Sequence, residues 1–348
     1  FKDLESELIP RLIELVHYAH SKDVEITIDA EEQDRLTLSL NIIEKLALDK
    51  VIKNWTGFGI ALQAYGKRSI NVIHWINKIL DKREKMHLRL VKGAYWDYEI
   101  KHAQVFGYED YPVYSKKSLT DISFLLCAKE ILKNERIYAK FATHNAHTIS
   151  SVHQLGQGKD YEFQRLYGMG ELLYQSAEKV LNLEKKPSVY APIGSYKDLL
   201  PYLVRRLLEN GANSSFINRL LDPETDANWL AENPAIRIEK EKIDIPLPKN
   251  IFTERKNSSG FDLSENSNLE NLEKSISAHK KNKINAESIY VNRDEKEKVG
   301  QKVYSIANNE EIGTAIFDDP TNVKSALENF ASEKWSKYSV QELSLIHI

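Results

Sequence analysis

Short apolar runs typical of β-strands alternate with segments of helical periodicity, and this alternation constrains the fold more than any other feature. The strand-like runs lie at residues 24–28, 58–62, 87–91, 137–142 and 161–166. Helical spacing of apolar residues marks residues 4–20, 36–48, 72–80, 122–132 and 149–155. Because a βαβα rhythm is typical of a parallel sheet covered by helices, we expect an α/β fold.

Polar residues follow these strands instead of being scattered along the chain. Asp29, Gln63, Lys92 and the run 143–145 each fall at or just after the carboxyl end of a strand. In a (β/α)8 barrel the loops that follow the strands converge on the catalytic face. We therefore predict the C-terminal part of a (β/α)8 TIM-like barrel, with five strands present and three expected before Phe1.

Composition excludes several classes of protein. With 348 residues, 42% of them hydrophobic and 28% charged, the chain can build a sizeable core and has room for two domains. A single cysteine, Cys127, excludes a disulfide framework and a multi-cysteine metal site, and its apolar neighbours predict core packing. The formal net charge of −3 offers no general footprint for nucleic acid, so we expect no nucleic-acid contact. No apolar run approaches the roughly 18–20 residues of a membrane span, and we expect a cytoplasmic location.

The character of the sequence changes near residue 235. We predict a barrel domain over residues 1–235, a linker over 236–284, and the start of a second module over 285–348. That module begins with a β-rich stretch near residues 290–315 and continues with a helix near 322–330. Because the chain has no initiator Met and ends without a helix cap or polar tail, we expect it to be cut at both ends.

Residues 89–96 (RLVKGAYW) form the most informative motif. A strand delivers two cations, Arg89 and Lys92, and then a Gly-Ala pair whose small size lets a ligand approach the backbone. Tyr95 and Trp96 supply flat faces for a planar ring system. The alternative is a surface turn followed by two core aromatic residues.

A second motif places Tyr202, Arg205, Arg206 and Glu209 on one broad face of a helix that the pair 210–211 would end. Paired guanidinium groups suit a carboxylate, which they can bind bidentately. The alternative is a solvated helix face with local ion pairs.

Residues 143–147 (THNAH) contain two histidines three residues apart. A structural metal site needs about four ligands, so we expect no metal and instead polar contacts to a cofactor. The alternative is a helix N-cap by Thr143 or Asn145. In the acidic run 29–32, one carboxylate could hold a charged ligand, whereas the others fit the first turn of a helix.

Taken together, these segments resemble the proline dehydrogenase region of the bifunctional bacterial proline utilisation proteins. The resemblance covers about residues 1–235, and the tail from about residue 290 weakly resembles the start of the family's NAD-dependent aldehyde dehydrogenase, which acts on glutamate semialdehyde. It rests on residues 28–32 (IDAEE), 89–96, 141–147 (FATHNAH), 190–192 (YAP) and 202–216 (YLVRRLLENGANSSF).

The resemblance implies roles for individual residues. Asp29 and Arg89 match the family's catalytic positions. The residues implied to contact FAD are Ala30, Gln63, Arg89, Val91, Lys92, Gly93, Ala94, Trp96, Ser115, Lys117, Thr143, His144, Asn145 and Gln164. Those implied to form the proline pocket are Tyr95, Leu166, Tyr190, Tyr202, Arg205, Arg206 and Glu209.

The resemblance also implies the chemistry. A flavin oxidises L-proline to 1-pyrroline-5-carboxylate and passes the electrons to a membrane quinone, so a cytoplasmic protein would contact the inner membrane when reduced. NAD would serve only the second enzyme, whose nucleophilic cysteine and most of whose NAD site are absent here. The parent protein is expected to be a homo-oligomer.

Some residues depart from the family pattern. Ser115 stands where relatives often have Thr, and Tyr167 where they often have His. A lysine that contacts the substrate carboxylate belongs to an early strand before Phe1. We therefore expect this chain on its own to fold poorly or to be inactive.

Two other functions remain open. One is another FAD-dependent barrel oxidoreductase, such as a relative of methylenetetrahydrofolate reductase, against which the pair Arg205 and Arg206 argues. The other is a non-catalytic regulatory or scaffold fragment, which a test for flavin absorbance would separate from either enzyme.

Overall fold

The computed structural model describes residues 3–211, 231–241, 245–280, 282–287, 300–332 and 337–342, and the side chains of 208–211 and 329–332 lie outside that description. The chain divides into two compact units, Phe1–Asn268 and Leu269–Ile348, which are described separately below.

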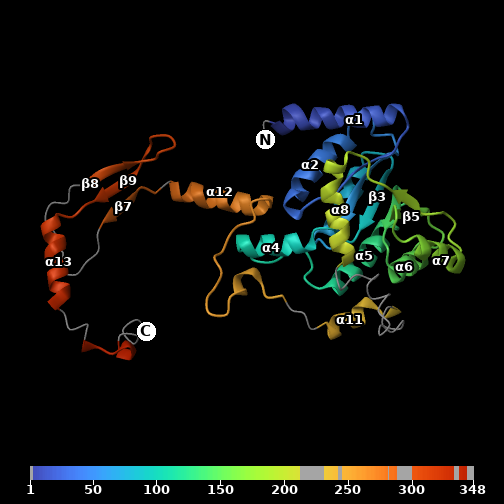
Figure 1. Cartoon of the computed structure of the whole chain (residues 1–348). Coiled ribbons are helices and arrows are strands. Elements are labelled where there is room, and N and C mark those ends of the chain that lie inside the picture. The colour runs from blue at the N-terminus through green and yellow to red at the C-terminus, as the bar shows by residue number, and fades with distance from the viewer. Residues whose placement is uncertain are drawn as a thin grey trace. The chain divides into compact units, whose positions relative to one another are not determined.

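The first unit is built on an all-parallel sheet whose six strands follow one another in sequence order, from β1 to β6 (Figure 1). Its strands are β1 (Ile26–Ile28), β2 (Phe58–Gln63), β3 (Met86–Val91), β4 (Ile137–Ala142), β5 (Tyr161–Leu166) and β6 (Ser188–Tyr190). The predicted parallel α/β sheet is confirmed, but the count of five strands was wrong. The sixth strand has only three residues, too few for a visible hydrophobic pattern.

Helices connect the strands. They are α1 (Ile9–Ser21), preceded by the one-turn η1 (Leu4–Leu8), then α2 (Leu36–Ala47), α3 (Ser69–Leu80), α4 (Trp96–Phe106), α5 (Lys117–Ile131), α6 (Ala146–Leu155), α7 (Glu171–Leu181), α8 (Tyr196–Gly211) and α11 (Pro234–Lys240). The sequence did not predict α4 or α7. In α4 the buried residues are only Glu99, Ile100 and Ala103, which leaves little apolar periodicity to detect.

Side chains of the strands alternate between two faces of the sheet. On the face toward the helices, Ile60, Leu62, Leu88 and Leu90 are buried in one large core. Cys127 of α5 is fully buried in the same core, as predicted. The intervening positions, which include Gln63 and Arg89, therefore belong to the opposite face.

Residues 245–265, here called the strap, lie along α4, although the sequence predicted a linker there. The Tyr111 hydroxyl donates to the carbonyl oxygen of Pro246 (2.7 Å), and the Asn257 side-chain amide donates to that of Gln104 (2.9 Å). The Gly260 amide donates to the carbonyl of Gly107 (2.9 Å). The strap contains the short η3 (Pro248–Asn250). The first unit therefore extends beyond residue 235. The division into a barrel domain, a linker and a second module, with the bounds given above, stays a prediction.

The second unit contains a three-stranded sheet in the order β7-β9-β8, followed by α13 (Pro320–Ser332). Strand β7 (Ile284–Glu287) runs parallel to β9 (Glu311–Ile316), and β8 (Gly300–Tyr304) runs antiparallel to it. Helix α12 (Asn266–Lys280) was not expected, because its apolar content is low. The predicted β-rich stretch is present in the described strands, whereas Tyr290 lies outside the described residues. Among those residues, no helix has the length and apolar character needed to cross a bilayer.

Candidate active site

The carboxyl ends of β1 and β3 are joined by an ion pair between Asp29 and Arg89. Asp29 directly follows β1, and Arg89 lies within β3 on the face away from the helices. The Arg89 side chain is 15% exposed, and this burial lowers its pKa from the ordinary value. Because an arginine pKa lies far above neutral, the guanidinium stays charged at pH 7. The two residues predicted to be catalytic are thus in direct contact.

Gln63 links two loops at the end of the sheet. Its side-chain nitrogen donates to the carbonyl of Glu31 (2.7 Å), and its side-chain oxygen accepts from the backbone amide of Ala94 (3.2 Å). The residue is 4% exposed, so both bonds are shielded from water. The structure therefore gives Gln63 a role in holding the loops after β1 and β3, and its predicted cofactor contact stays a prediction.

Gly93 is a glycine for two structural reasons. Its φ of +138° lies in a region that side chains rarely adopt, and a Cβ atom there would come within 2.5 Å of the Tyr65 ring. Beside it, the Lys92 ammonium pairs with Asp121 of α5, which orients the cation at the end of β3. Val91 ends β3 and pairs in register with Gln63.

Two aromatic residues follow this glycine, and their surroundings differ. The Tyr95 hydroxyl donates to the Glu31 carboxylate, and burial together with that carboxylate raises the pKa of Tyr95 to about 12. The Trp96 indole donates to the carbonyl of Tyr114 (2.8 Å) and packs against a small core around Tyr65. Trp96 is therefore a core residue, as in the alternative interpretation of this motif, whereas Tyr95 faces the loop after β1.

Both arginines of α8 lie beside aromatic rings. The Arg205 guanidinium lies 5.7 Å from the ring centre of Tyr95, and that of Arg206 lies 5.4 Å from the ring of its own-helix neighbour Tyr202. The ring centres of Tyr202 and Tyr190 are 6.3 Å apart. These residues were predicted to share a pocket, and the structure brings them together.

Arg89 also lies beside one of these aromatic rings, because its guanidinium is 5.9 Å from the ring centre of Tyr190. Arg89 of the predicted catalytic pair is therefore linked to Arg206 of α8 through two tyrosine rings, those of Tyr190 and Tyr202. The side chain of Glu209 lies outside the described residues.

His144 is held as a neutral donor beside this group. Its Nε2 accepts from the backbone amide of Leu166 (3.1 Å), which places the ring proton on Nδ1. Burial, and then the charges of Arg206 and Arg165, lower the pKa of His144 to about 4. At neutral pH the imidazole therefore offers one N–H as a hydrogen-bond donor.

The neighbouring loop residues have structural roles. The Asn145 side chain accepts from the Thr148 amide (2.9 Å) and caps α6, which confirms the capping alternative for this residue. The Thr143 hydroxyl accepts from the Asn145 amide (3.2 Å). Gln164 donates to Glu162 (2.8 Å) within β5. Among the described residues, no group of three His, Cys, Asp or Glu could hold a metal ion.

The remaining predicted cofactor residues lie at the edge of this region. Ser115 lies in the loop that precedes α5, and Lys117 is the first residue of that helix, with an exposed side chain.

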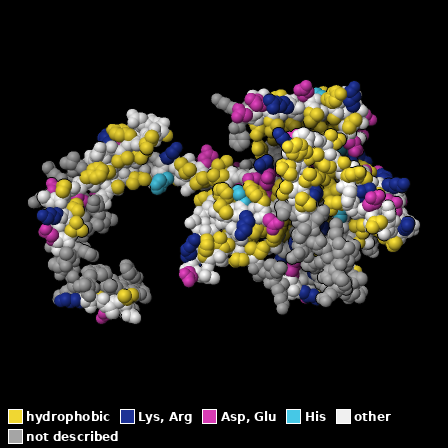
Figure 2. Space-filling model, in the orientation of Figure 1, with side chains coloured by type: hydrophobic (Ala, Val, Ile, Leu, Met, Phe, Trp, Pro, Cys, Tyr) yellow, Lys and Arg dark blue, Asp and Glu magenta, His cyan; other side chains and the backbone are white. Residues whose placement is uncertain are grey.

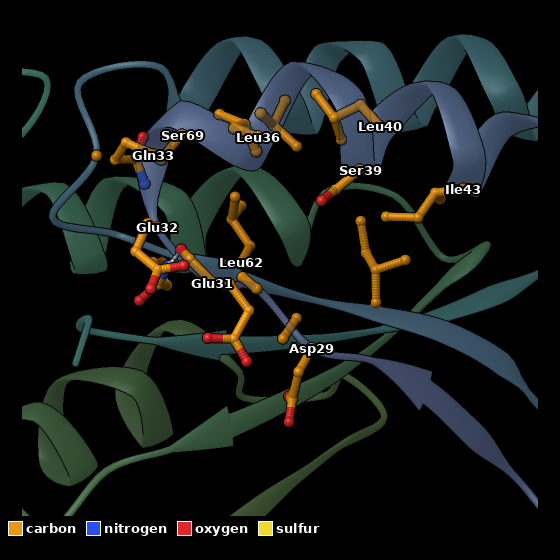
Figure 3. Close-up of a pocket in the computed structure, with 16 residues that line it drawn as sticks. Asp29, Glu31, Glu32, Gln33, Leu36, Ser39, Leu40, Ile43, Leu62 and Ser69 are labelled. Atoms are coloured by element: carbon orange, nitrogen blue, oxygen red, sulfur yellow. Dashed lines mark hydrogen bonds between the residues drawn. The ribbon is translucent and has the colours of Figure 1, made fainter. Parts of the chain in front are cut away.

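Ala30 follows Asp29 and lines a pocket between the strands β1 and β2 and helix α2 (Figure 3). The carboxylates of Asp29 and Glu31 lie at one side of that pocket, and Leu36 and Leu40 of α2 line the other.

Sequence reasoning missed three contributors. The sequence predicted a binding role for one carboxylate of the run 29–32 and a helix first turn for the others, without singling out Glu31. The turn η2 (Gln33–Arg35) begins after Glu31, and Glu31 binds Tyr95. Asp121 and Tyr65 act through partners far away in sequence, so no local pattern marks them. For Glu31, the only available signal was its place two residues after Asp29.

Known proteins match this chain over most of the first unit. The family model for proline dehydrogenase matches residues 2–219. The bifunctional protein PutA of Klebsiella aerogenes is 45% identical over 78% of this chain and 22% of its own length, and that of Escherichia coli K12 is 44% identical over the same shares. The chain thus spans about a fifth of the length of these relatives.

Solved structures match the fold as well. A crystal structure of a bifunctional proline utilization A protein is 43% identical, with a TM-score of 0.75 over 80% of this chain and 29% of that chain. The likeness confirms the predicted TIM-like fold class, in which the six parallel strands form a half-barrel.

Proposed function

This chain belongs to the proline dehydrogenase family, and on that premise we propose that it carries the site at which the full-length protein oxidises L-proline to 1-pyrroline-5-carboxylate, with FAD as cofactor and a quinone as final electron acceptor. Helix α8 supplies the observation that carries this proposal. It brings two guanidinium groups against the rings of Tyr95 and Tyr202, next to the largely shielded Arg89.

Such an arrangement fits a small amino acid with a carboxylate. Arg205 and Arg206 present planar forks that can bind a carboxylate bidentately. The rings of Tyr95, Tyr190 and Tyr202 form apolar walls, which favour a compact ring by shape and exclude water from it. A folate would have no need for this clamp, and a scaffold would have no need to bury a cation.

The hydrogen-bond donors and cations at the strand ends are of the chemical types that bind a flavin dinucleotide. Arg89 and Lys92 are cations at the end of β3, and the neutral His144 offers a single N–H. These three, with the backbone around Gly93 and Ala94, would hold the cofactor. When bound, a flavin supplies a hydride acceptor.

The protein's own residues supply position and charge. To give 1-pyrroline-5-carboxylate, a hydride leaves the ring carbon that is bonded to the nitrogen but does not carry the carboxylate. The nitrogen loses its proton, and a C=N bond forms between these two atoms. The arginine clamp holds the carboxylate so that this carbon is presented in one orientation, which is the proximity contribution. Asp29 holds the Arg89 guanidinium in a fixed position beside Tyr190.

The wider organisation is part of the same proposal. Residues 236–284 would connect the barrel to an aldehyde dehydrogenase-like domain that begins near residue 285 and would use NAD. The β7-β9-β8 sheet followed by α13 supports a separate folded module there. The full-length protein would be a homo-oligomer in the cytoplasm that contacts the membrane when reduced.

The experiment is a steady-state assay of the full-length protein, with FAD, L-proline and a soluble quinone. We expect quinone reduction that requires proline, and a loss of at least tenfold in kcat/KM for Arg206→Met. Arg11→Met, a change at an exposed arginine of α1, is the control and should leave the rate unchanged. Equal rates with and without proline would contradict the proposal.

A further inference from the structure

One arginine outside the proposed site binds both the loop that carries Asp29 and the strap. The η2 loop, defined here as residues 29–35, connects β1 to α2. Arg68 donates through Nη2 to the carbonyl oxygen of Gln33 in this loop (2.7 Å). Through Nη1 the same guanidinium forms an ion pair with Glu265 of the strap. Both side chains are partly shielded, at 25% and 33% exposure, so the pair is stronger than a fully solvated one.

Glu265 is delivered to Arg68 by an ordered turn. The Ser264 amide donates to the Asp262 carboxylate (3.0 Å), and the Asn268 side chain donates to the Asp262 carbonyl (3.1 Å). Before this turn, Gly260 is bonded to Gly107, and a Cβ atom on Gly107 would lie only 1.8 Å from the Ser258 carbonyl oxygen. The strap therefore lies close against the end of α4, which fixes where Glu265 can reach.

Gln33 is also held from its other side. Its backbone amide donates to the carboxylate of Glu99 in α4 (2.7 Å), and Glu99 is 2% exposed. A Cβ atom on Gly66 would lie 2.9 Å from the Gln33 side-chain oxygen, so these two residues are packed together. Helix α4 thus binds the loop directly through Glu99 and indirectly through the strap, Glu265 and Arg68.

These bonds bear on the site because the η2 loop is short. Glu31, two residues before Gln33, accepts from Tyr95 and Gln63, and Asp29 pairs with Arg89. A shift of Gln33 would therefore be transmitted to both carboxylates. None of the residues that hold Gln33 was among the site residues predicted from the sequence.

We propose that Arg68 and Glu265 are positioning residues: the strap, acting through them, fixes the η2 loop and so sets the position of Asp29 and Glu31. The consequence for proline oxidation rests on the proposed function. The consequence for loop order does not, because it depends only on contacts within the first unit.

The test is amide hydrogen exchange on the full-length protein, comparing Glu265→Gln with the unsubstituted form. Glu270→Gln, a change at an exposed carboxylate of α12, is the matched control. We expect amides of residues 29–35 to exchange about 3- to 10-fold faster in Glu265→Gln, with β4 unchanged and the control unchanged. Unchanged exchange in the η2 loop, or an equal rise in β4, would overturn the proposal.

Kinetics of the same variants separate a positioning role from a binding role. Because the arginine clamp is untouched, Glu265→Gln should lower kcat about 3- to 10-fold and leave KM for proline within about twofold. Adding Glu265→Gln to Arg68→Ala should have no further effect, since Glu265 acts through Arg68. A rise in KM with kcat preserved, or additive losses, would contradict the positioning role. If the unsubstituted protein does not oxidise proline, the proposed function fails, and the exchange result still decides whether the strap fixes the loop.

Discussion

The guanidinium of Arg205 lies over the ring of Tyr95, 5.7 Å from its centre. This contact joins α8 to the loop after β3, and Tyr95 in turn donates to Glu31 in the loop after β1. A cation on a helix and a carboxylate on a distant loop are therefore connected through one side chain. The proposed proline pocket depends on this connection.

The carboxylate clamp gives the first prediction. Arg205→Lys should raise KM for proline about 10- to 100-fold, because a lysine keeps the charge but loses the bidentate fork and the ring contact. Steady-state kinetics of the full-length protein measure this. Arg11→Lys on the exposed face of α1 should leave KM unchanged. Equal KM values for Arg205→Lys and the unsubstituted protein would show that Arg205 does not bind substrate.

Gly93 gives a prediction about stability. Gly93→Ala should lower the free energy of unfolding by about 2–4 kcal/mol, because it combines an unfavourable φ with a clash against Tyr65. Urea denaturation measures the loss. Gly158→Ala is the matched control, since Gly158 also has a positive φ of +73° but open space around it, and should lose only about 1 kcal/mol. Equal losses at the two positions would mean that packing against Tyr65 contributes nothing.

Glu99 predicts a pH dependence of stability. Burial raises the pKa of Glu99 to about 7 from its usual 4.5, with Asp34 and Glu32 adding to the effect. In the folded state this carboxyl keeps its proton at pH values where the unfolded chain has lost it. Its contribution to stability is therefore fully present below pH 4.5 and is lost as the pH rises through about 7, by up to about 3 kcal/mol.

Glu99→Gln tests this pH dependence, because glutamine keeps an oxygen that can accept from Gln33 but does not titrate. Urea unfolding at pH 5 and pH 8 should show a smaller difference in the variant than in the unsubstituted protein. Glu14→Gln, at an exposed position of α1, should behave like the unsubstituted protein. An identical pH difference in all three proteins would contradict the assignment.

The state of His144 can be observed directly. Nitrogen-15 NMR of the imidazole should show the neutral form with its proton on Nδ1 from pH 8 down to about pH 5, because the pKa is lowered to about 4. Protonation with a midpoint near the ordinary 6.5 would contradict the buried, arginine-flanked environment. A proton on Nε2 would contradict the bond from Leu166.

Local pattern predicted much of the fold, because strands and helices leave periods of two and 3.6 residues in the sequence. It placed Asp29, Gln63 and Lys92 at strand ends, where the structure has them. It failed for β6, which is too short to carry a period, and for α4, which buries few apolar residues.

The partners of the site residues were a different problem. Glu31, Asp121 and Tyr65 matter because of residues that lie far away in sequence, and only the folded chain brings them together. The strap is the clearest case, since its polar, Gly- and Ser-containing sequence is typical of a linker. Its hydrogen bonds to residues 104–111 all end on backbone carbonyl oxygens, which leave no mark on composition.

The surface of the first unit shows apolar side chains over α8, where Leu200, Leu203, Val204 and Leu207 are exposed (Figure 2). The opposite side of the same helix carries Arg205 and Arg206 toward the aromatic rings. An amphipathic helix usually buries its apolar face, whereas α8 exposes apolar side chains and directs its two arginines toward the aromatic rings. This orientation is what the proposed function requires of it.

The most direct test of the central claim is the visible absorbance of the purified full-length protein, recorded without oxygen before and after L-proline is added. We expect flavin bands that bleach when proline is added, and that no longer bleach when Arg205 and Arg206 are both replaced by methionine. Flavin bands indifferent to proline would contradict proline as the substrate, and a spectrum with no flavin would contradict the cofactor and the enzyme together.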